Sequence, residues 1–378
     1  MKQDPYIGFV VMQQLLTTDI EFIERRANIM KKMTEFTPGK LWPDRSGNHI
    51  SAHGGGILLH EGTYYWYGED NTKGYLNDVG VSCYSSRDLY NWTYEGTALR
   101  QEAMPEELQG KNNGRIERPK VIYNPKTKKF VMWMHAERSG YAFSSAGIAI
   151  SDHPTGEFKF LFYDRPVLYE PDAGFDEHTN EKALGNSFRD MHVFVDDQDI
   201  NNDGVNDAYV FYASEGNWTM YVVRLNADYT WIDLPVQTDR IRPQATEKHL
   251  GEVWSRQFVR KMREAPTPFK YQNKYYLLTS ACTGWEPNQA EYAVADHPLG
   301  DYVTQGDPCV DDTERNTFQS QSTNVLPIDN GKFIYIGDRW QPDNLGKSTY
   351  VWLPLEIDSD EKVRIIWRDK WSIADLKE

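Results

Sequence analysis

One pattern recurs five times along the chain and restricts the folds that it can adopt. Each occurrence is a turn followed by alternating aromatic and aliphatic residues: GTYYWYGED (62–70), KKFVMWMHAE (128–137), DAYVFYASE (207–215), NKYYLLTSA (273–281) and GKFIYIGDRW (331–340). Such alternation is typical of β-strands that bury one face. A second strand pattern follows each of them, and SDHPTGEF (151–158) nearly repeats as ADHPLGDY (295–302).

These units recur about every 60 to 80 residues, which predicts radial repetition of small antiparallel sheets. We therefore predict an all-β fold, a five-bladed β-propeller, over residues 41–378. A two-sheet sandwich of unrelated hairpins is the alternative, but the paired motifs recur in order and favour the propeller. Residues 1–40 do not follow the repeat. Within them, DIEFIERRANIMKKM (19–33) has the apolar spacing of a helix and predicts a short N-terminal helical extension outside the propeller.

Composition argues against several kinds of partner. The 378 residues carry a net charge of −15, which disfavours nucleic acid and anionic membrane surfaces. No apolar run is long enough to span a bilayer, and IGFVVMQQLL (7–16) is too short and too interrupted to predict a secretion signal. The three cysteines, Cys83, Cys282 and Cys309, are too far apart to indicate a disulfide framework or a metal site.

The run His53-Gly54-Gly55-Gly56 comes just before a hairpin, although glycine costs backbone entropy there. A His-Gly-Gly-Gly run can form the oxyanion hole of an esterase, but that chemistry needs a Gly-x-Ser-x-Gly elbow, which the sequence lacks. A phosphate loop is excluded because no helical pattern follows. The run therefore predicts a close approach of the backbone to another strand or to a ligand.

The loop DDQDINNDGVNDAY (196–209) has the composition of a calcium site. Its oxygen-bearing side chains have calcium-loop spacing around a glycine: Asp199, Asn201, Asp203 and Asp207. The bidentate glutamate expected at the twelfth position is missing, because Val210 stands there. A hairpin turn rich in Asn, Asp and Gly is the alternative that we favour, so no metal or other cofactor is expected to be required.

A polar residue precedes or opens the first strand of each predicted blade: His53, Glu117, Asp190, Glu264 and Gln321. The first strand of a blade lines the central channel, so these side chains are expected to converge. Three carboxylates in one funnel suit hydrolysis of a glycosidic bond, in which one carboxylic acid protonates the leaving oxygen. A neighbouring carboxylate can raise the pKa of that acid through like charge. The alternative is that each carboxylate simply pairs with an adjacent arginine.

Several motifs together resemble glycoside hydrolase family 43. REAPTPFKYQNKYYLLTS (263–280) looks like the general-acid motif of that family, and RDMHVFVDD (189–197) resembles its middle blade. Five more segments resemble its exo-β-1,3-galactanase branch more than its arabinan or xylan branches: HISAHGGGILLHEGTYYWYGE (49–69), ERPKVIYNPKTKKFVMWMH (117–135), SACTGWEPN (280–288), SQSTNVLPI (320–328) and YIGDRW (335–340). The resemblance covers residues 38–370 and implies hydrolysis with inversion.

The resemblance also implies roles for individual residues. Glu264 matches the general acid, and Asp190 matches the carboxylate that orients this acid and raises its pKa. Glu117 and Glu69 match carboxylates that bind or polarise the terminal sugar. The other expected substrate contacts are His53, Tyr141 in SGYAFSSAG, Thr283, Trp285, Gln319 and Arg339.

The catalytic base is the point at which this sequence departs from most of the family. The usual base is an aspartate before the first inner strand, where this chain has AHGGG (52–56). The galactanase branch shares that absence, and its base role is attributed to a glutamine acting as an imidic acid. Gln321 is the best match, with Gln319 as its competitor. On this interpretation, the glycines leave room for the sugar.

The sequence thus predicts an exo-acting, inverting glycoside hydrolase that releases galactose from β-1,3-galactan of the arabinogalactan type. Alternatives are an α-L-arabinofuranosidase or β-xylosidase of the same fold, an inactive sugar-binding propeller, and a protein-interaction propeller. The missing base aspartate favours the inactive module, whereas the Glu264–Asp190 pair argues against it. We expect a monomer with a polysaccharide or oligosaccharide as its partner. Its function implies a secreted or periplasmic location, although no signal peptide is visible.

Overall fold

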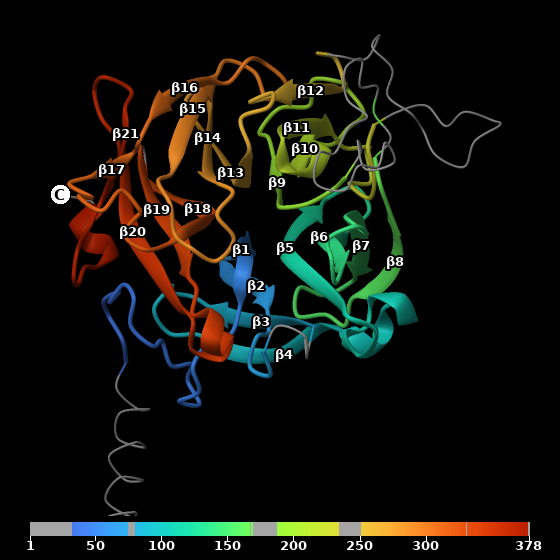
Figure 1. The fold of residues 1–378 in the computed structure, drawn as a ribbon, viewed down its shortest axis with the longest axis horizontal. Coiled ribbons are helices and arrows are strands. Elements are labelled where there is room, and N and C mark those ends of the chain that lie inside the picture. The colour runs from blue at the N-terminus through green and yellow to red at the C-terminus, as the bar shows by residue number, and fades with distance from the viewer. Residues whose placement is uncertain are drawn as a thin grey trace, which may run out of the picture.

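The computed structural model describes residues 32–74, 80–166, 168, 187–233, 251–329 and 331–376. Within these ranges the chain forms five sheets, antiparallel except for one edge strand, that follow one another around a common centre (Figure 1). This arrangement confirms the predicted five-bladed β-propeller. Residues 1–31, which contain most of the predicted helical extension, lie outside the described ranges. No helix in the described ranges has the length and apolar character to cross a membrane.

Four blades have four strands each, in sequence order from the centre outward. The first comprises β1 (His53–His60), β2 (Thr63–Glu69), β3 (Gly80–Ser86) and β4 (Thr93–Arg100). The second comprises β5 (Gly114–Asn124), β6 (Lys129–Arg138), β7 (Ser145–Ser151) and β8 (Lys159–Asp164). The third comprises β9 (Met191–Val195), β10 (Ala208–Ser214), β11 (Thr219–Arg224) and β12 (Trp254–Gln257). The fourth comprises β13 (Arg263–Tyr271), β14 (Lys274–Ala281), β15 (Glu291–Ala295) and β16 (Val303–Gly306).

The fifth blade has an additional strand at its outer edge, where β17 pairs parallel to β21. Its strands are β18 (Gln321–Asp329), β19 (Lys332–Arg339), β20 (Thr349–Ile357), β21 (Val363–Ile366) and β17 (Cys309–Val310). The helices among the described residues are short 3₁₀ turns: Gln101–Ala103, Glu106–Leu108, Gly110–Asn112, Glu215–Asn217, Pro342–Lys347 and Ile373–Leu376.

The first hairpin shows how the repeated motif forms a blade. Glu61 and Gly62 connect β1 to β2 with φ values of 48° and 73°, and such a two-residue turn matches the twist of paired strands. Ile57 lies opposite Trp66 in the resulting ladder. The Trp66 side chain is 1% exposed and belongs to a cluster of aromatic rings between the first and last blades.

The ring of blades is closed by residues that precede β1 and follow β21. The Phe36 amide donates to the Trp371 carbonyl at 2.7 Å, and the Trp371 amide donates back at 3.2 Å. The two rings pack 4.6 Å apart within the cluster that also contains Trp66 and Trp352. Phe36 lies before the predicted domain boundary at residues 40 and 41, so the closing segment extends across that boundary.

The three glycines of β1 each face another part of the protein. A Cβ on Gly54 would lie 2.3 Å from Glu69 Oε1, and one on Gly55 would lie 1.9 Å from the Tyr67 carbonyl oxygen. A Cβ on Gly56 would lie 2.6 Å from Cδ of Lys120, whose side chain is buried. The glycines thus admit the protein's own backbone and charged side chains. The expectation that they leave room for the sugar is wrong.

Candidate active site

All five blades contribute to one cavity of about 550 Å³ at the centre of the propeller. Seven of the predicted site residues line it: Glu69, Glu117, Tyr141, Asp190, Glu264, Trp285 and Gln321. Gln319 and Arg339 line an adjoining cavity of about 270 Å³, which shares Trp285, Gln321 and Trp340 with the larger one. The sequence therefore located residues from all five blades that meet at one place.

Two predicted contacts lie elsewhere. His53 is fully buried and lines neither cavity; its ring stacks on Tyr350, and its Nδ1 lies 3.3 Å from Asp338 Oδ1. Thr283 is exposed and lines neither cavity. Its hydroxyl bonds the Glu286 carbonyl at 2.6 Å. Neither residue lines the cavity in which the other predicted site residues meet.

Irregular pairing at the start of the inner strands helps to direct the polar side chains. The register shifts directly after Glu117 in β5, after Glu264 in β13 and after Ser322 in β18. A bulge of this kind bends the strand and redirects a side chain. Ala265 follows Glu264 with a φ of 51°, a value that non-glycine residues seldom adopt. The strands are therefore locally distorted where they supply the cavity.

Glu264 is half-buried and is surrounded by hydrogen-bond donors. Gln321 Nε2 donates to its Oε1 at 3.0 Å, and Asn217 Nδ2 donates to its Oε2 at 3.3 Å. The backbone amide of Ala265, the residue after Glu264, donates to Asp190 Oδ2 at 3.1 Å. Burial, followed by the charge of Asp190, raises the pKa of Glu264 to about 8, although Arg118 opposes the shift. This shift favours the protonated form of Glu264, which is the form that a general acid needs.

Arg118 connects the carboxylates of the cavity, a role that was not predicted from the sequence. Its Nη2 lies 3.1 Å from Asp190 Oδ2 and also donates to Gln321 Oε1. Its backbone amide donates to Glu69 Oε1 at 2.9 Å. Three blades are thereby joined to the second blade by one buried residue. Its place beside Glu117 in ERP gave no sign of this role, because the groups that it contacts belong to other blades.

The amide of Gln321 has a defined orientation. Its Oε1 accepts from Arg118 and from Trp340 Nε1, the latter at 3.2 Å, and both partners can only donate. Its Nε2 donates to Glu264 Oε1 and to Ser280 Oγ, each at 3.0 Å. All four hydrogen-bonding positions of the amide are thus occupied.

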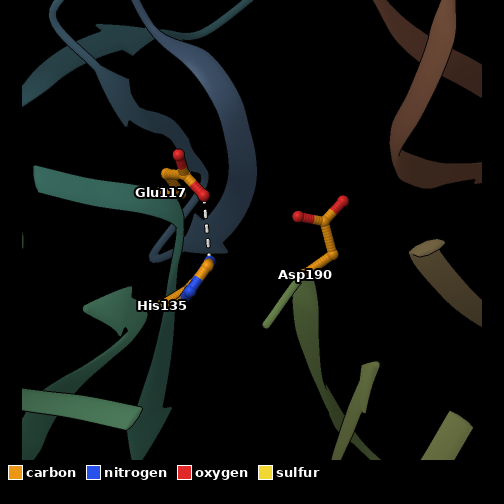
Figure 2. Close-up of side chains that lie close together, drawn as sticks. All are labelled: Glu117, His135 and Asp190. Atoms are coloured by element: carbon orange, nitrogen blue, oxygen red, sulfur yellow. Dashed lines mark ion pairs between the residues drawn. The ribbon is translucent and has the colours of Figure 1, made fainter. Parts of the chain in front are cut away.

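Glu117 is held from both of its oxygens. His135 Nδ1 lies 3.0 Å from Oε2, and the Tyr141 hydroxyl donates to Oε1 at 2.8 Å. Figure 2 shows Asp190 facing this pair from the neighbouring blade. Burial would lower the pKa of His135, but its contacts with Glu117 and Glu137 raise that pKa to about 9. His135 is therefore an imidazolium between two carboxylates.

Glu69 is a buried acidic group of the cavity, with 7% of its surface exposed. Burial, and then the charge of Glu117, raises the pKa of Glu69 well above its ordinary value, while the Arg118 amide opposes the shift. This shift favours the protonated carboxyl, which can donate as well as accept hydrogen bonds. Trp285 stands at the mouth with 37% of its surface exposed, 5.2 Å from the ring of Trp340. Both aromatic rings offer apolar faces to a sugar.

Glu117, His135 and Asp190 have the spacing of a metal site, since each offers a ligand atom within 4.8 Å of the others. The groups that contact these three residues argue against metal binding. A metal needs a deprotonated histidine, whereas His135 is shared between Glu117 and Glu137. Asp190 already pairs with the Arg118 guanidinium, which would repel a cation.

The acidic loop after β9 uses its side chains within the loop itself. Asp199 accepts the amides of Asp203 and Gly204 at 3.1 and 3.0 Å. Asp203 accepts the Val205 amide at 3.1 Å. Carboxylates that accept nearby backbone amides are typical of Asx turns, so this geometry supports the turn over the calcium loop.

We expect chelation of divalent metals to leave both activity and melting temperature unchanged. The measurement compares kcat and Tm before and after EDTA treatment and dialysis, with and without added Ca²⁺ or Zn²⁺. A loss of kcat that a metal restores would contradict our view of Glu117, His135 and Asp190. A fall in Tm that Ca²⁺ reverses would instead reveal a calcium site in the loop around Asp199.

Several residues in or beside the cavity escaped the sequence analysis: Arg118, His135, Glu137, Asn217, Cys282 and Trp340. His135 and Glu137 offered a signal, because they alternate at the end of the otherwise apolar strand KFVMWMHAER. Two polar side chains on one face of a buried strand require partners. Asn217 offered none, because its contact with Glu264 depends on how the third and fourth blades meet. Cys282, which follows β14 in the same blade as Glu264, offered none either.

Comparison with known proteins places these features in context. A family model for glycosyl hydrolases family 43 matches residues 55–336. A GH43 β-1,3-galactosidase solved with galactodeoxynojirimycin is 36% identical, with a TM-score of 0.75 over 89% of this chain and 100% of its own. An exo-β-1,3-galactanase from Clostridium thermocellum is 35% identical, with a TM-score of 0.72 over 89% of this chain and 66% of its own.

A variant of the exo-β-1,3-galactanase from Phanerochaete chrysosporium, solved with β-1,3-galactotriose, is also similar. It is 31% identical, with a TM-score of 0.74, over 90% of this chain and 68% of its own. A comparison with curated protein sequences gave no significant match.

Proposed function

Because the chain belongs to glycosyl hydrolase family 43, it is a glycoside hydrolase, and we propose that it releases galactose from the end of β-1,3-linked galactan. The similar solved structures, at 31% to 36% identity, are a β-1,3-galactosidase and exo-β-1,3-galactanases. The observation that carries the proposal is the cavity in which Glu264, Asp190 and Glu117 meet. A polysaccharide substrate of the arabinogalactan type implies action outside the cytoplasm.

We assign the acid step to Glu264. Its pKa of about 8 leaves the carboxyl protonated at neutral pH, when it can donate to the glycosidic oxygen as the bond breaks. Asp190 accepts the Ala265 amide and so holds the backbone beside the acid. The intact pair favours catalysis over the inactive sugar-binding propeller.

We assign activation of the attacking water to Gln321. The hydrogen bonds of its amide limit when a water can reach it. A water can approach the amide only when one of its four contacts opens. The contact from Nε2 to Glu264 Oε1 opens if the acid turns toward a glycosidic oxygen. Substrate arrival would therefore free the amide at the moment when the water is needed. Attack by that water opposite the leaving group inverts the anomeric carbon. The proton that the water loses passes to Gln321 Nε2, which can accept it only when the amide is in its imidic-acid form.

The sugar itself is assigned to the carboxyl groups and aromatic rings of the cavity. Glu117 is fixed by His135 and Tyr141 and can accept hydrogen bonds from ring hydroxyls. Glu69 faces the same cavity. Trp285 offers a stacking face at the mouth, where apolar C–H groups of a pyranose commonly pack on aromatic rings.

We expect galactose to be the only early product from β-1,3-galacto-oligosaccharides, and we expect its α-anomer to appear first. The measurement is ¹H NMR of the anomeric region from the first minutes, before mutarotation mixes the anomers. Linear arabinan and xylan oligosaccharides serve as matched controls. Arabinose or xylose as the preferred product would overturn the sugar assignment. Longer early products would overturn the exo mode, and initial β-galactose would overturn inversion.

A further inference from the structure

Glu137 is a buried carboxylate that the reaction described so far does not use. It lies near the end of β6, its side chain is 0% exposed, and it does not line either cavity. Its Oε1 accepts the amides of Arg138 and Phe143 at 2.7 and 3.0 Å. Its Oε2 accepts the Ser144 amide and hydroxyl at 3.0 and 2.8 Å and contacts His135 Nε2 at 3.0 Å.

The partners of Glu137 are the groups that hold Glu117. One connection runs through the imidazole, because His135 Nε2 contacts Glu137 and His135 Nδ1 contacts Glu117 Oε2. The other runs through the loop that carries Tyr141, whose hydroxyl donates to Glu117 Oε1. Within that loop Tyr141 and Ser144 have φ values of 54° and 38°, a strained backbone that its surroundings must hold in place.

We propose that Glu137 is a positioning residue for this enzyme, fixing Glu117 through His135 and Tyr141 without touching the substrate. The proposal rests on the proposed function, because it gives Glu117 the task of binding the sugar. Both oxygens of Glu117 are oriented by groups that Glu137 itself orients. A single buried residue thus defines the direction in which Glu117 presents its lone pairs to the cavity.

The charges around Glu117 and His135 show why an anion is needed at Glu137. The carboxylates of Glu117 and Glu137 each lie 3.0 Å from a ring nitrogen of His135, and together they raise its pKa. The imidazolium in turn offsets the repulsion between Glu117 and its acidic neighbours. The other groups that face Glu117 or its partners are Glu69, Asp190, Arg115 and Arg189. Replacing the anion by an amide would leave His135 neutral and Glu117 less well held.

The first test is a double-mutant cycle on kcat/KM. We expect Glu137→Gln to lower kcat/KM by about 100-fold, the size of effect that a displacement of about 1 Å can cause. In a Glu117→Gln background the same change should cost less than about 2-fold, because its only route to the substrate is gone. A full 100-fold cost in both backgrounds would overturn the proposal, since Glu137 would then act by another route.

The second test needs no substrate. In ¹⁵N–¹H spectra at pH 7, His135 of the wild type should show two protonated ring nitrogens, and in Glu137→Gln it should show one. Loss of the signal in His135→Gln assigns it. A doubly protonated His135 in Glu137→Gln would contradict the link between the two residues. If the wild type fails to cleave galactan, the proposed substrate is wrong. The double-mutant cycle is then measured on the sugar that the wild type does cleave.

A control separates positioning from loss of stability. Asp196, after the far end of β9, is also buried; it pairs with Lys270 and accepts the Tyr275 hydroxyl at 2.6 Å. Asp196→Asn should lower Tm and leave kcat/KM unchanged. If Glu137→Gln does not fold, Ser144→Ala, which removes one donor to Glu137, should lower kcat/KM several-fold in the same cycle. An unchanged kcat/KM in Ser144→Ala would then count against the proposal.

Discussion

Replacement of Glu264 by glutamine is expected to lower kcat on β-1,3-galacto-oligosaccharides by about 10²–10⁴-fold, the usual contribution of a general acid. Glutamine keeps the size of the side chain and its contact with Gln321, but it has no proton to give to the leaving oxygen. An aryl galactoside whose leaving group needs no proton should lose much less. Steady-state kinetics on both substrates, with Tm as the check on folding, make the comparison.

The pH dependence provides a separate check on the same residue. Only protonated Glu264 is active as an acid, so kcat/KM should be retained below its pKa of about 8 and lost as pH rises through that value. This alkaline limb should vanish on the aryl substrate with Glu264→Gln. An equal loss on both substrates, or an alkaline limb that survives the replacement, would show that another group is the acid.

Gln321→Ala is expected to lower kcat by at least about 10²-fold with little change in KM, because the water and not the sugar loses its partner. Azide attacks without being deprotonated, so it should restore part of the turnover and give a galactosyl azide of inverted configuration. Product analysis by NMR and mass spectrometry measures both effects. Gln319→Ala, in the adjoining cavity, should change KM more than kcat.

The contacts of Gln321 also define the outcome that would contradict this role. If azide gives no rescue but a good leaving group restores turnover, Gln321 serves only to hold Glu264, and Glu117 becomes the candidate base. Gln321→Glu adds information in either case. A new carboxylate at the position of Nε2, 3.0 Å from Glu264 Oε1, should raise the pKa of the acid by like charge. The alkaline limb should then move to higher pH.

The sequence predicted the blades well because each strand carries its own signal. Trp66, Trp133 and Trp352 occupy buried positions in alternating strands, and alternation is visible without knowledge of the partners. The start of each inner strand was equally informative, since Glu117, Glu264 and Gln321 occupy matching places in their blades. Position in a repeat therefore predicted which side chains converge.

Other features of the site depend on contacts between blades, which no local pattern records. Arg118 reaches Asp190 and Gln321 in two other blades, so its importance appears only once the ring is assembled. His53 has the same place in its blade as Glu117, yet Asp338 and Tyr350 of the fifth blade cover it. Its burial could not be predicted from β1 alone.

The pairing of Phe36 with Trp371 has a consequence for synthesis of the protein on the ribosome. Phe36, Trp42 and Trp66 are translated about 300 residues before the rings that cover them, Trp352 and Trp371. Contacts between such distant parts of a chain form slowly, and uncovered apolar surface favours aggregation during that delay. The aromatic face of the first blade must therefore wait for translation of the fifth blade and of Trp371 before it is shielded from water and from other nascent chains.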